Sequence, residues 1–271
     1  MIRTTFIAVA PFPVPAPPPR GSVYLPREHG SWSLALEPLA LGLLVAPSAA
    51  GVALVVSAAS AFLLRRPLKL ALAPAANAPR PGVRGVCLLL ATCSGLGLLA
   101  AWLLGGTAAL WPLLLAIPPG ALFLYFDRQN EMRAAAAELS GSTAFAVLPA
   151  ALATLAHWPA APALALAGVM LARNFPTVLT VRTYLRLNKG GVAHPLWPIV
   201  AGSLALLGLL ALGRLHLVPW TASVLAAVLL ARTLFFVTPL RPAWPARRVG
   251  FLEAGIGVAY VGLIALSWPA R

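Results

Sequence analysis

Apolar residues dominate this chain in long runs, which short connections rich in proline and basic residues separate. A helix crosses a hydrocarbon core about 30 Å thick with roughly 20 consecutive apolar residues, and most of the runs approach this length. The pattern therefore predicts an all-α, polytopic integral membrane protein with about nine transmembrane helices. The runs are residues 31–47, 49–64, 85–104, 108–126, 139–156, 160–181, 196–213, 217–237 and 249–268.

The first 21 residues do not fit this pattern. They contain a short apolar stretch followed by a proline-rich one, which is typical of a flexible tail rather than a membrane helix. We expect residues 1–21 to form such a tail and residues 22–271 to form a single transmembrane domain.

Composition supports a membrane protein, since 60% of the residues are hydrophobic and only 10% are charged. A soluble domain carries roughly 25% charged residues. The 20 Lys and Arg outnumber the 6 Asp and Glu, which gives a net charge of +14. Sixteen of the 20 basic residues fall in alternate connections, on the side of the N-terminus. Because basic connections stay in the cytoplasm, we expect a cytoplasmic N-terminus and no nucleic-acid partner.

The acidic residues gather on the same side, and several fall inside apolar runs. Ionisable groups at membrane depth are costly, so they usually line a cavity or pair with one another. We therefore predict one polar cavity that opens to the cytoplasm. Ion pairs that only clamp the helix ends are the alternative interpretation. The cavity would contain Glu28, Glu37, Asp127, Glu131, Arg173 and Glu253.

The first polar segment, Pro26-Arg27-Glu28-His29-Gly30-Ser31-Trp32, leads into the first apolar run. Glu28 and His29 are candidate headgroup ligands, while a Trp at this place is a usual interfacial anchor. The segment resembles the entry segment of the YwiC-like family of bacterial membrane proteins, and the likeness extends over roughly residues 22–268. This resemblance implies a multi-pass protein of the bacterial inner membrane.

The second polar segment runs from Leu124 to Gly141 and contains Asp127, Asn130 and Glu131. In a helix these three would share one face, where they could hold Mg²⁺ through a substrate phosphate. A solvated turn is the alternative. The segment resembles the fourth-to-fifth helix connection of UbiA-type prenyltransferases, which implies a nine-helix, UbiA-like bundle with a cytoplasm-facing active site.

The third polar segment contains Arg173, Asn174 and Arg182, at the place where a UbiA-type enzyme has its second Asp-rich motif. The first such motif is replaced by Arg65-Arg66-Pro67-Leu68-Lys69. Without these carboxylates we expect no metal and no cofactor. Arginine binds phosphate or carboxylate directly through its planar fork, so an anionic or phosphorylated lipid is a candidate ligand.

Two functions remain open from the sequence. One is binding, or acting on, an isoprenoid or other anionic lipid at the cytoplasmic leaflet. The other is transport, or ligand binding without catalysis, on the same scaffold. The candidate ligand-binding residues are Glu28, His29, Glu37, Asp127, Asn130, Glu131, Arg173, Asn174, Arg182 and Glu253.

Overall fold

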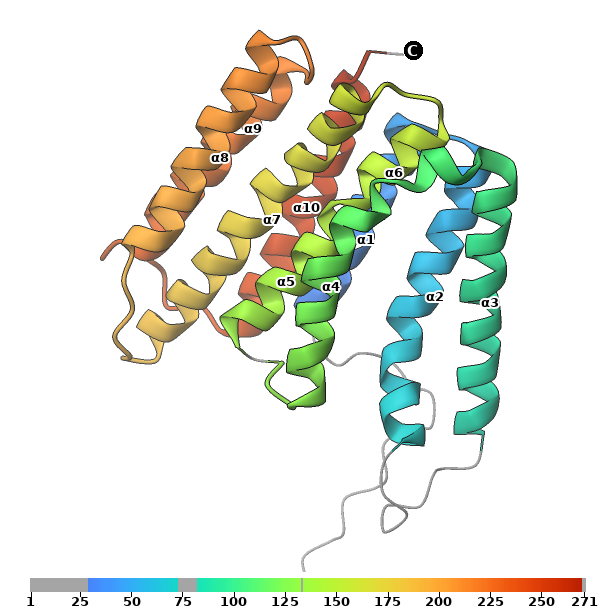
Figure 1. The fold of residues 1–271 in the computed structure, drawn as a ribbon. Helices are drawn as coiled ribbons and strands as arrows, with labels where there is room; N and C mark the ends of the chain where they lie inside the picture. Colours follow the sequence, from blue (N-terminus) through green and yellow to red (C-terminus); the bar gives the residue numbers. More distant parts are fainter. Residues whose placement is uncertain (1–28, 73–81, 133, 270–271) are drawn as a thin grey trace, which may run out of the picture.

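The computed structural model describes residues 29–72, 82–132 and 134–269, and the regular elements in these ranges are all helices (Figure 1). The tail over residues 1–21 and the candidate ligand Glu28 lie outside the described residues. The helices are α1 (His29–Val45), α2 (Ala49–Ala71), α3 (Val83–Gly105), the 3₁₀ turn η3 (Thr107–Leu110), α4 (Leu113–Arg128), α5 (Ala135–Ala146), α6 (Leu148–Leu155), α7 (Ala160–Asn188), α8 (Leu196–Arg214), α9 (Trp220–Val237) and α10 (Ala246–Ser267).

Each of the nine predicted apolar runs is helical. Within the described residues, seven helices are long and apolar enough to cross a membrane, with α5 and α6 counted together as one span. The two remaining runs form shorter helices, since α1 has 17 residues and α4 has 16. The prediction of an all-α, polytopic membrane protein is thus confirmed.

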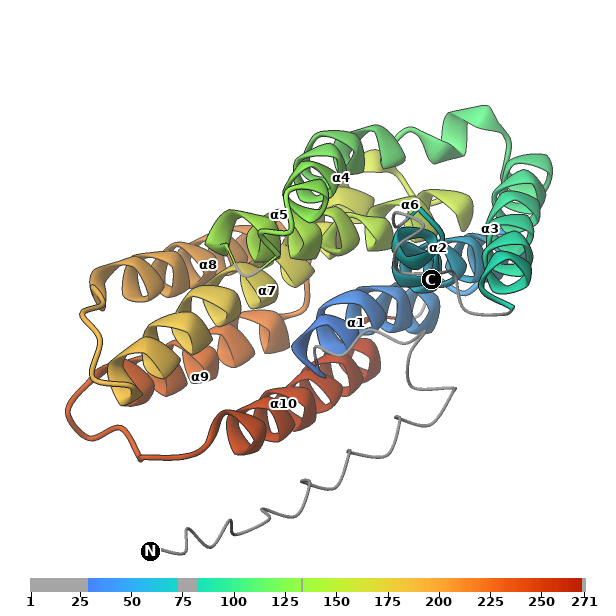
Figure 2. The same cartoon turned by 90° about the horizontal axis from the view of Figure 1, so that it is seen from below.

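Helix α7 occupies the middle of the bundle and packs against α1, α5, α6, α8 and α9. The first described helix, α1, packs against the last, α10, and the two lie side by side in Figure 2. Helices α8 and α9 flank α7 at one edge, and α2 and α3 form an antiparallel pair at the other edge (Figure 1). Segments far apart in the sequence therefore meet at the centre.

Helix α3 turns most of its surface away from the bundle. Val83, Gly97 and Ala101 are its buried residues, and its many leucines are exposed. At Gly97 a Cβ atom would lie 2.8 Å from the carbonyl oxygen of Ala53, so the absence of a side chain lets α3 approach the backbone of α2 closely. The outward leucines match a helix whose solvent is lipid.

The two ends of the bundle differ in their number of basic residues. The end of the bundle that lies at the bottom of Figure 1 carries most of the described basic residues, and we call it the basic end. At the opposite end, Arg214 closes α8. This distribution is the one that alternate basic connections predict. The described basic residues at the basic end are Arg65, Arg66, Lys69, Arg84, Arg128, Arg182, Arg186, Lys189, Arg241, Arg247 and Arg248.

The largest apolar core lies around α7, where Leu166 and Met170 pack with Leu209 and Ile264 from α8 and α10. Nearer the basic end, the same interior contains charged side chains from α1, α7, α9 and α10. These charges define the candidate site.

Candidate functional site

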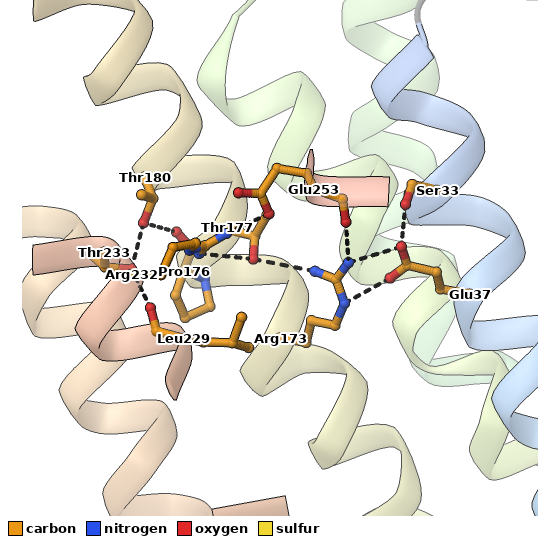
Figure 3. A network of polar contacts seen from close by, with 10 residues as sticks. All are labelled: Ser33, Glu37, Arg173, Pro176, Thr177, Thr180, Leu229, Arg232, Thr233 and Glu253. Atoms are coloured by element: carbon orange, nitrogen blue, oxygen red, sulfur yellow. Dashed lines mark hydrogen bonds and ion pairs between the residues drawn. The ribbon is translucent and has the colours of Figure 1, made fainter. Parts of the chain in front are cut away.

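Arg173 of α7 and Glu37 of α1 form a buried ion pair at the centre of the bundle (Figure 3). Arg173 Nη2 donates to Glu37 Oε1 at 2.8 Å, and Arg173 Nε lies 2.8 Å from Glu37 Oε2, close but without hydrogen-bond alignment. Ser33, one helical turn before Glu37, donates to the same Oε1 atom. Arg173 is 1% exposed and Glu37 is 6% exposed, so the pair is closed to the surface.

Further contacts fix the guanidinium of Arg173. Its Nη2 donates to the backbone carbonyl of Glu253 at 3.2 Å, and its Nη1 donates to Thr177 Oγ1 at 3.4 Å. The ring of Tyr260 lies 5.7 Å from the guanidinium carbon, and the Tyr260 hydroxyl donates to the carbonyl of Val169. Arg173 therefore joins α1, α7 and α10 through one side chain.

A second ion pair joins α9 to α10 beside the first, because Arg232 Nη1 contacts Glu253 Oε2. Arg232 Nη2 also donates to Thr177 Oγ1 at 3.4 Å. The Thr177 hydroxyl thus accepts from both arginines and lies between the two pairs (Figure 3). Two arginines face two glutamates, so the four-helix cluster is balanced in charge.

Not every buried polar atom in the cluster has a partner among the described residues. Both amide atoms of Asn174 lack one, although this side chain is only 1% exposed. Arg232 Nε and Glu253 Oε1 lack one as well. A buried polar atom without a partner costs about 1–3 kcal/mol. Asn174 follows Arg173 and is one turn from Thr177 on α7, so it adjoins the cluster along this helix.

The cluster lies in the half of the bundle nearer the basic end. Arg232 precedes the end of α9 at Val237 by five residues, or about 8 Å. Glu253 follows the start of α10 at Ala246 by seven residues, or about 10 Å. Along α7, Asn174 precedes the end of the helix at Asn188 by 14 residues, or about 21 Å.

Asp127 takes part in a different contact. At the end of α4 its carboxylate lies 2.9 Å from Arg65 Nη2 and 3.3 Å from Lys69 Nζ, both on α2. Arg65 also lies over the ring of Phe123, at 4.7 Å. Burial by itself would raise the pKa of Asp127, but the hydrogen bond and charge of Arg65, with the charge of Lys69, lower this pKa below its ordinary value.

We expect Asp127→Asn to lower the free energy of unfolding at pH 7 by about 1–2 kcal/mol. Because the folded pKa is lowered, the contribution of this carboxylate is full above the ordinary Asp pKa of about 4 and fades as the pH falls through the lowered value. Denaturant unfolding of the wild type and of Asp127→Asn at pH 7 and pH 3 measures this contribution to the free energy of unfolding. An equal effect of Asp127→Asn at both pH values would contradict the assignment, and Glu131→Gln serves as the exposed control.

The other sequence candidates are spread over the basic end. Helix α4 ends at Arg128 and Asn130 has a positive φ of 61°, so Asp127, Asn130 and Glu131 do not share the helical face considered above. Arg182 forms a half-exposed pair with Glu138 at 2.9 Å. The side chain of His29 lies outside what the structure describes.

Of the six residues expected in one cavity, the structure brings together Glu37, Arg173 and Glu253. Asp127 is held instead by α2, and Glu131 is exposed. Among the described residues, no three His, Cys, Asp or Glu side chains gather as metal ligands would. The charged interior is thus an arginine–glutamate cluster.

Sequence reasoning missed Arg232, Thr177 and Ser33 as members of this cluster. Arg232 carried a usable signal, because it interrupts an apolar run and incurs the same insertion cost that marks Arg173. Thr177 and Ser33 carried none, since single hydroxyls are common in membrane helices.

A cavity of about 400 Å³ lies at the opposite end of the bundle. Its lining comes from the α8–α9 connection and the end of α10, and includes His216, Trp220 and Trp268. It lies far along the helices from both ion pairs and offers mainly apolar surface, so we do not place the functional site there.

Comparison with known proteins adds one similarity. No curated protein and no solved structure matches the chain. Residues 25–152, which include α1 with Glu37 and the Arg65–Asp127 contact, match the family described as YwiC-like protein.

Proposed function

We propose that this multi-pass membrane protein binds the polar headgroup of an isoprenoid or other anionic lipid, which enters the cluster of Arg232, Glu253 and Asn174 from the cytoplasmic side. The observation that carries the proposal is Asn174, a fully buried amide with no partner for its donor or its acceptor among the described residues. A headgroup hydroxyl, carbonyl or ester would satisfy both atoms.

The position of the cluster supports a lipid rather than a soluble ligand. Arg232 and Glu253 lie about 8–10 Å from the ends of α9 and α10 at the basic end, the depth at which headgroups meet acyl chains. Because two glutamates balance two arginines, the part of the ligand that enters the cluster is best polar and uncharged. An anionic portion would remain outside, near the basic end. The likeness of residues 124–141 to UbiA-type prenyltransferases favours an isoprenoid.

Transport is the second candidate, and the shared hydroxyl of Thr177 favours it. Arg173 and Arg232 both donate to this atom at 3.4 Å, so a small shift of α9 or α10 against α7 would let either arginine change partners. Exchange between paired charges at membrane depth is a usual device of ion-coupled carriers.

The decisive experiment replaces Asn174 with leucine, which has nearly the same size and no polar atoms. Lipid retained by the purified protein is measured by native mass spectrometry, and stabilisation by added lipid extract is measured by thermal unfolding. A lipid at a hundredfold excess over its Kd stabilises by about 2.7 kcal/mol. We expect Asn174→Leu to lose the lipid species that occupies the cluster, together with the part of the stabilisation that this species gives.

Ser223→Ala is the matched control, because Ser223 Oγ is also buried with no partner in the described part of the chain but lies near the start of α9, at the opposite end. This variant should retain lipid as the wild type does. If Asn174→Leu retains and responds to lipid as the wild type does, the proposal fails. Uptake of a radiolabelled solute by vesicles, lost in Thr177→Val, would favour transport instead.

A further inference from the structure

The connection between α9 and α10, residues 238–245, is held firmly although it is not helical. The buried hydroxyl of Tyr184 on α7 donates to the carbonyl of Pro242 at 2.6 Å and accepts from the backbone N–H of Trp244 at 3.0 Å. Asn188 Nδ2 donates to the same Pro242 carbonyl at 3.3 Å. The end of α7 therefore fixes the position of this connection.

Aromatic packing strengthens the attachment. The ring of Phe236 lies 4.8 Å from that of Tyr184 and 6.2 Å from that of Trp244, edge to face in the second case. With Val249 these residues form a small core of their own at the basic end. The backbone that bears the neighbouring arginines is consequently rigid.

Three arginines lie in this connection or in the first turn of α10 that follows it. Arg248 lies over the ring of Trp244 at 4.4 Å, and Arg247 lies over that of Phe251 at 5.5 Å. Arg241 donates to the carbonyl of Thr238 at 3.3 Å. In the described part of the chain, no carboxylate lies within ion-pair distance of any of the three, whereas Arg65, Lys69 and Arg182 at the same end are all paired.

Apolar surface accompanies this uncompensated charge. Phe251 is 60% exposed and Leu240 is 78% exposed, while Arg247 and Arg248 are exposed beside them. Aromatic rings with arginines at the end of membrane helices match the boundary between acyl chains and headgroups. Guanidinium groups held over rings present their N–H donors in a fixed plane, which suits the oxygens of a phosphate.

We propose that Arg241, Trp244, Arg247, Arg248 and Phe251 form a binding surface for the phosphate of an anionic phospholipid, and we call it the α9–α10 platform. The arginines bind the phosphate, and the exposed Phe251 and Leu240 contact the adjoining acyl chains. This site is separate from the buried cluster and does not depend on the function proposed for it.

The test adds phosphatidylglycerol, phosphatidylcholine or inorganic phosphate to the protein in neutral detergent and measures bound lipid by native mass spectrometry and stabilisation by thermal unfolding. We expect phosphatidylglycerol to bind more tightly than phosphatidylcholine, with a preference that weakens in high salt. The double variant Arg247→Gln, Arg248→Gln should bind phosphatidylglycerol about 30-fold more weakly, from the usual contribution of two surface arginines.

Arg214→Gln is the matched control, because Arg214 also lies over a ring, Trp220 at 5.8 Å, but at the opposite end. It should bind phosphatidylglycerol as the wild type does, and so should Asn174→Leu, which separates this proposal from the one above. If the double variant binds phosphatidylglycerol as tightly as the wild type, the proposed platform is wrong. Stabilisation by inorganic phosphate without a response to phosphatidylglycerol would show that the bound phosphate does not belong to a phospholipid. The single variant Arg247→Lys, with its charge kept and its fork lost, should fall between wild type and double variant.

Discussion

Arg173→Ala is expected to lower the free energy of unfolding by about 3–5 kcal/mol, because it leaves the carboxylate of Glu37 buried without its cation. The loss reflects an uncompensated charge more than the strength of the original pair. Denaturant or thermal unfolding in detergent, with no lipid added, measures it directly.

Two comparisons make this measurement specific. Arg182→Ala breaks the pair with Glu138, whose side chains are 33% and 38% exposed, and should cost no more than about 1 kcal/mol. Combining Arg173→Met with Glu37→Gln removes both charges and should recover much of the lost stability. If Arg173→Ala proved as mild as Arg182→Ala, the central ion pair would not stabilise the bundle.

Gly257→Ala is expected to be nearly as damaging, although it adds one methyl group. A Cβ atom at Gly257 on α10 would overlap Glu37 Oε1 and Arg173 Nη2, and moving either atom away would separate the buried charges of the pair. Overpacking of this kind costs about 1–3 kcal/mol, and forcing the two charges apart adds to it. The same unfolding assay measures the effect.

Gly255→Ala, two residues earlier on α10, provides the control, since nothing lies within 4 Å of the Cβ it would add. Replacing a helical glycine with alanine there should be neutral or stabilise by up to about 1 kcal/mol. In an Arg173→Ala background, Gly257→Ala should cost clearly less than in the wild type, because the atoms it would overlap are partly gone. Additive effects of the two substitutions would refute this account of the glycine.

Hydropathy predicted the positions of the helices well because membrane burial acts on each run separately. It did not predict their interruptions. The run at 139–156 forms two helices that meet at Val147, just before Pro149, and the run at 108–126 begins with the 3₁₀ turn Thr107–Leu110 before α4. These breaks follow from proline geometry and local packing, to which an average over 20 residues is insensitive.

The sequence predicted which kinds of residue form the candidate site, but it predicted their pairing less well. The insertion cost of a buried charge singled out Glu37, Arg173 and Glu253, and these three do meet. That cost does not say which acid faces which arginine, since Glu37 and Arg173 are 136 residues apart in the chain. Asp127 was grouped with them because it shares their side of the membrane, but its helix packs so that α2 supplies its partners.

The distance in sequence between Glu37 and Arg173 has a consequence for biogenesis. Helix α1 is short and carries an acid near its middle, so on its own it is a poor candidate for release into lipid from the insertion machinery. The arginine that neutralises this acid is synthesised 136 residues later, and the carbonyl of Glu253 that completes the contact follows another 80 residues on. We therefore expect α1 to gain its stable place in the bundle only once α7 has been synthesised, and its full set of contacts only once α10 has followed.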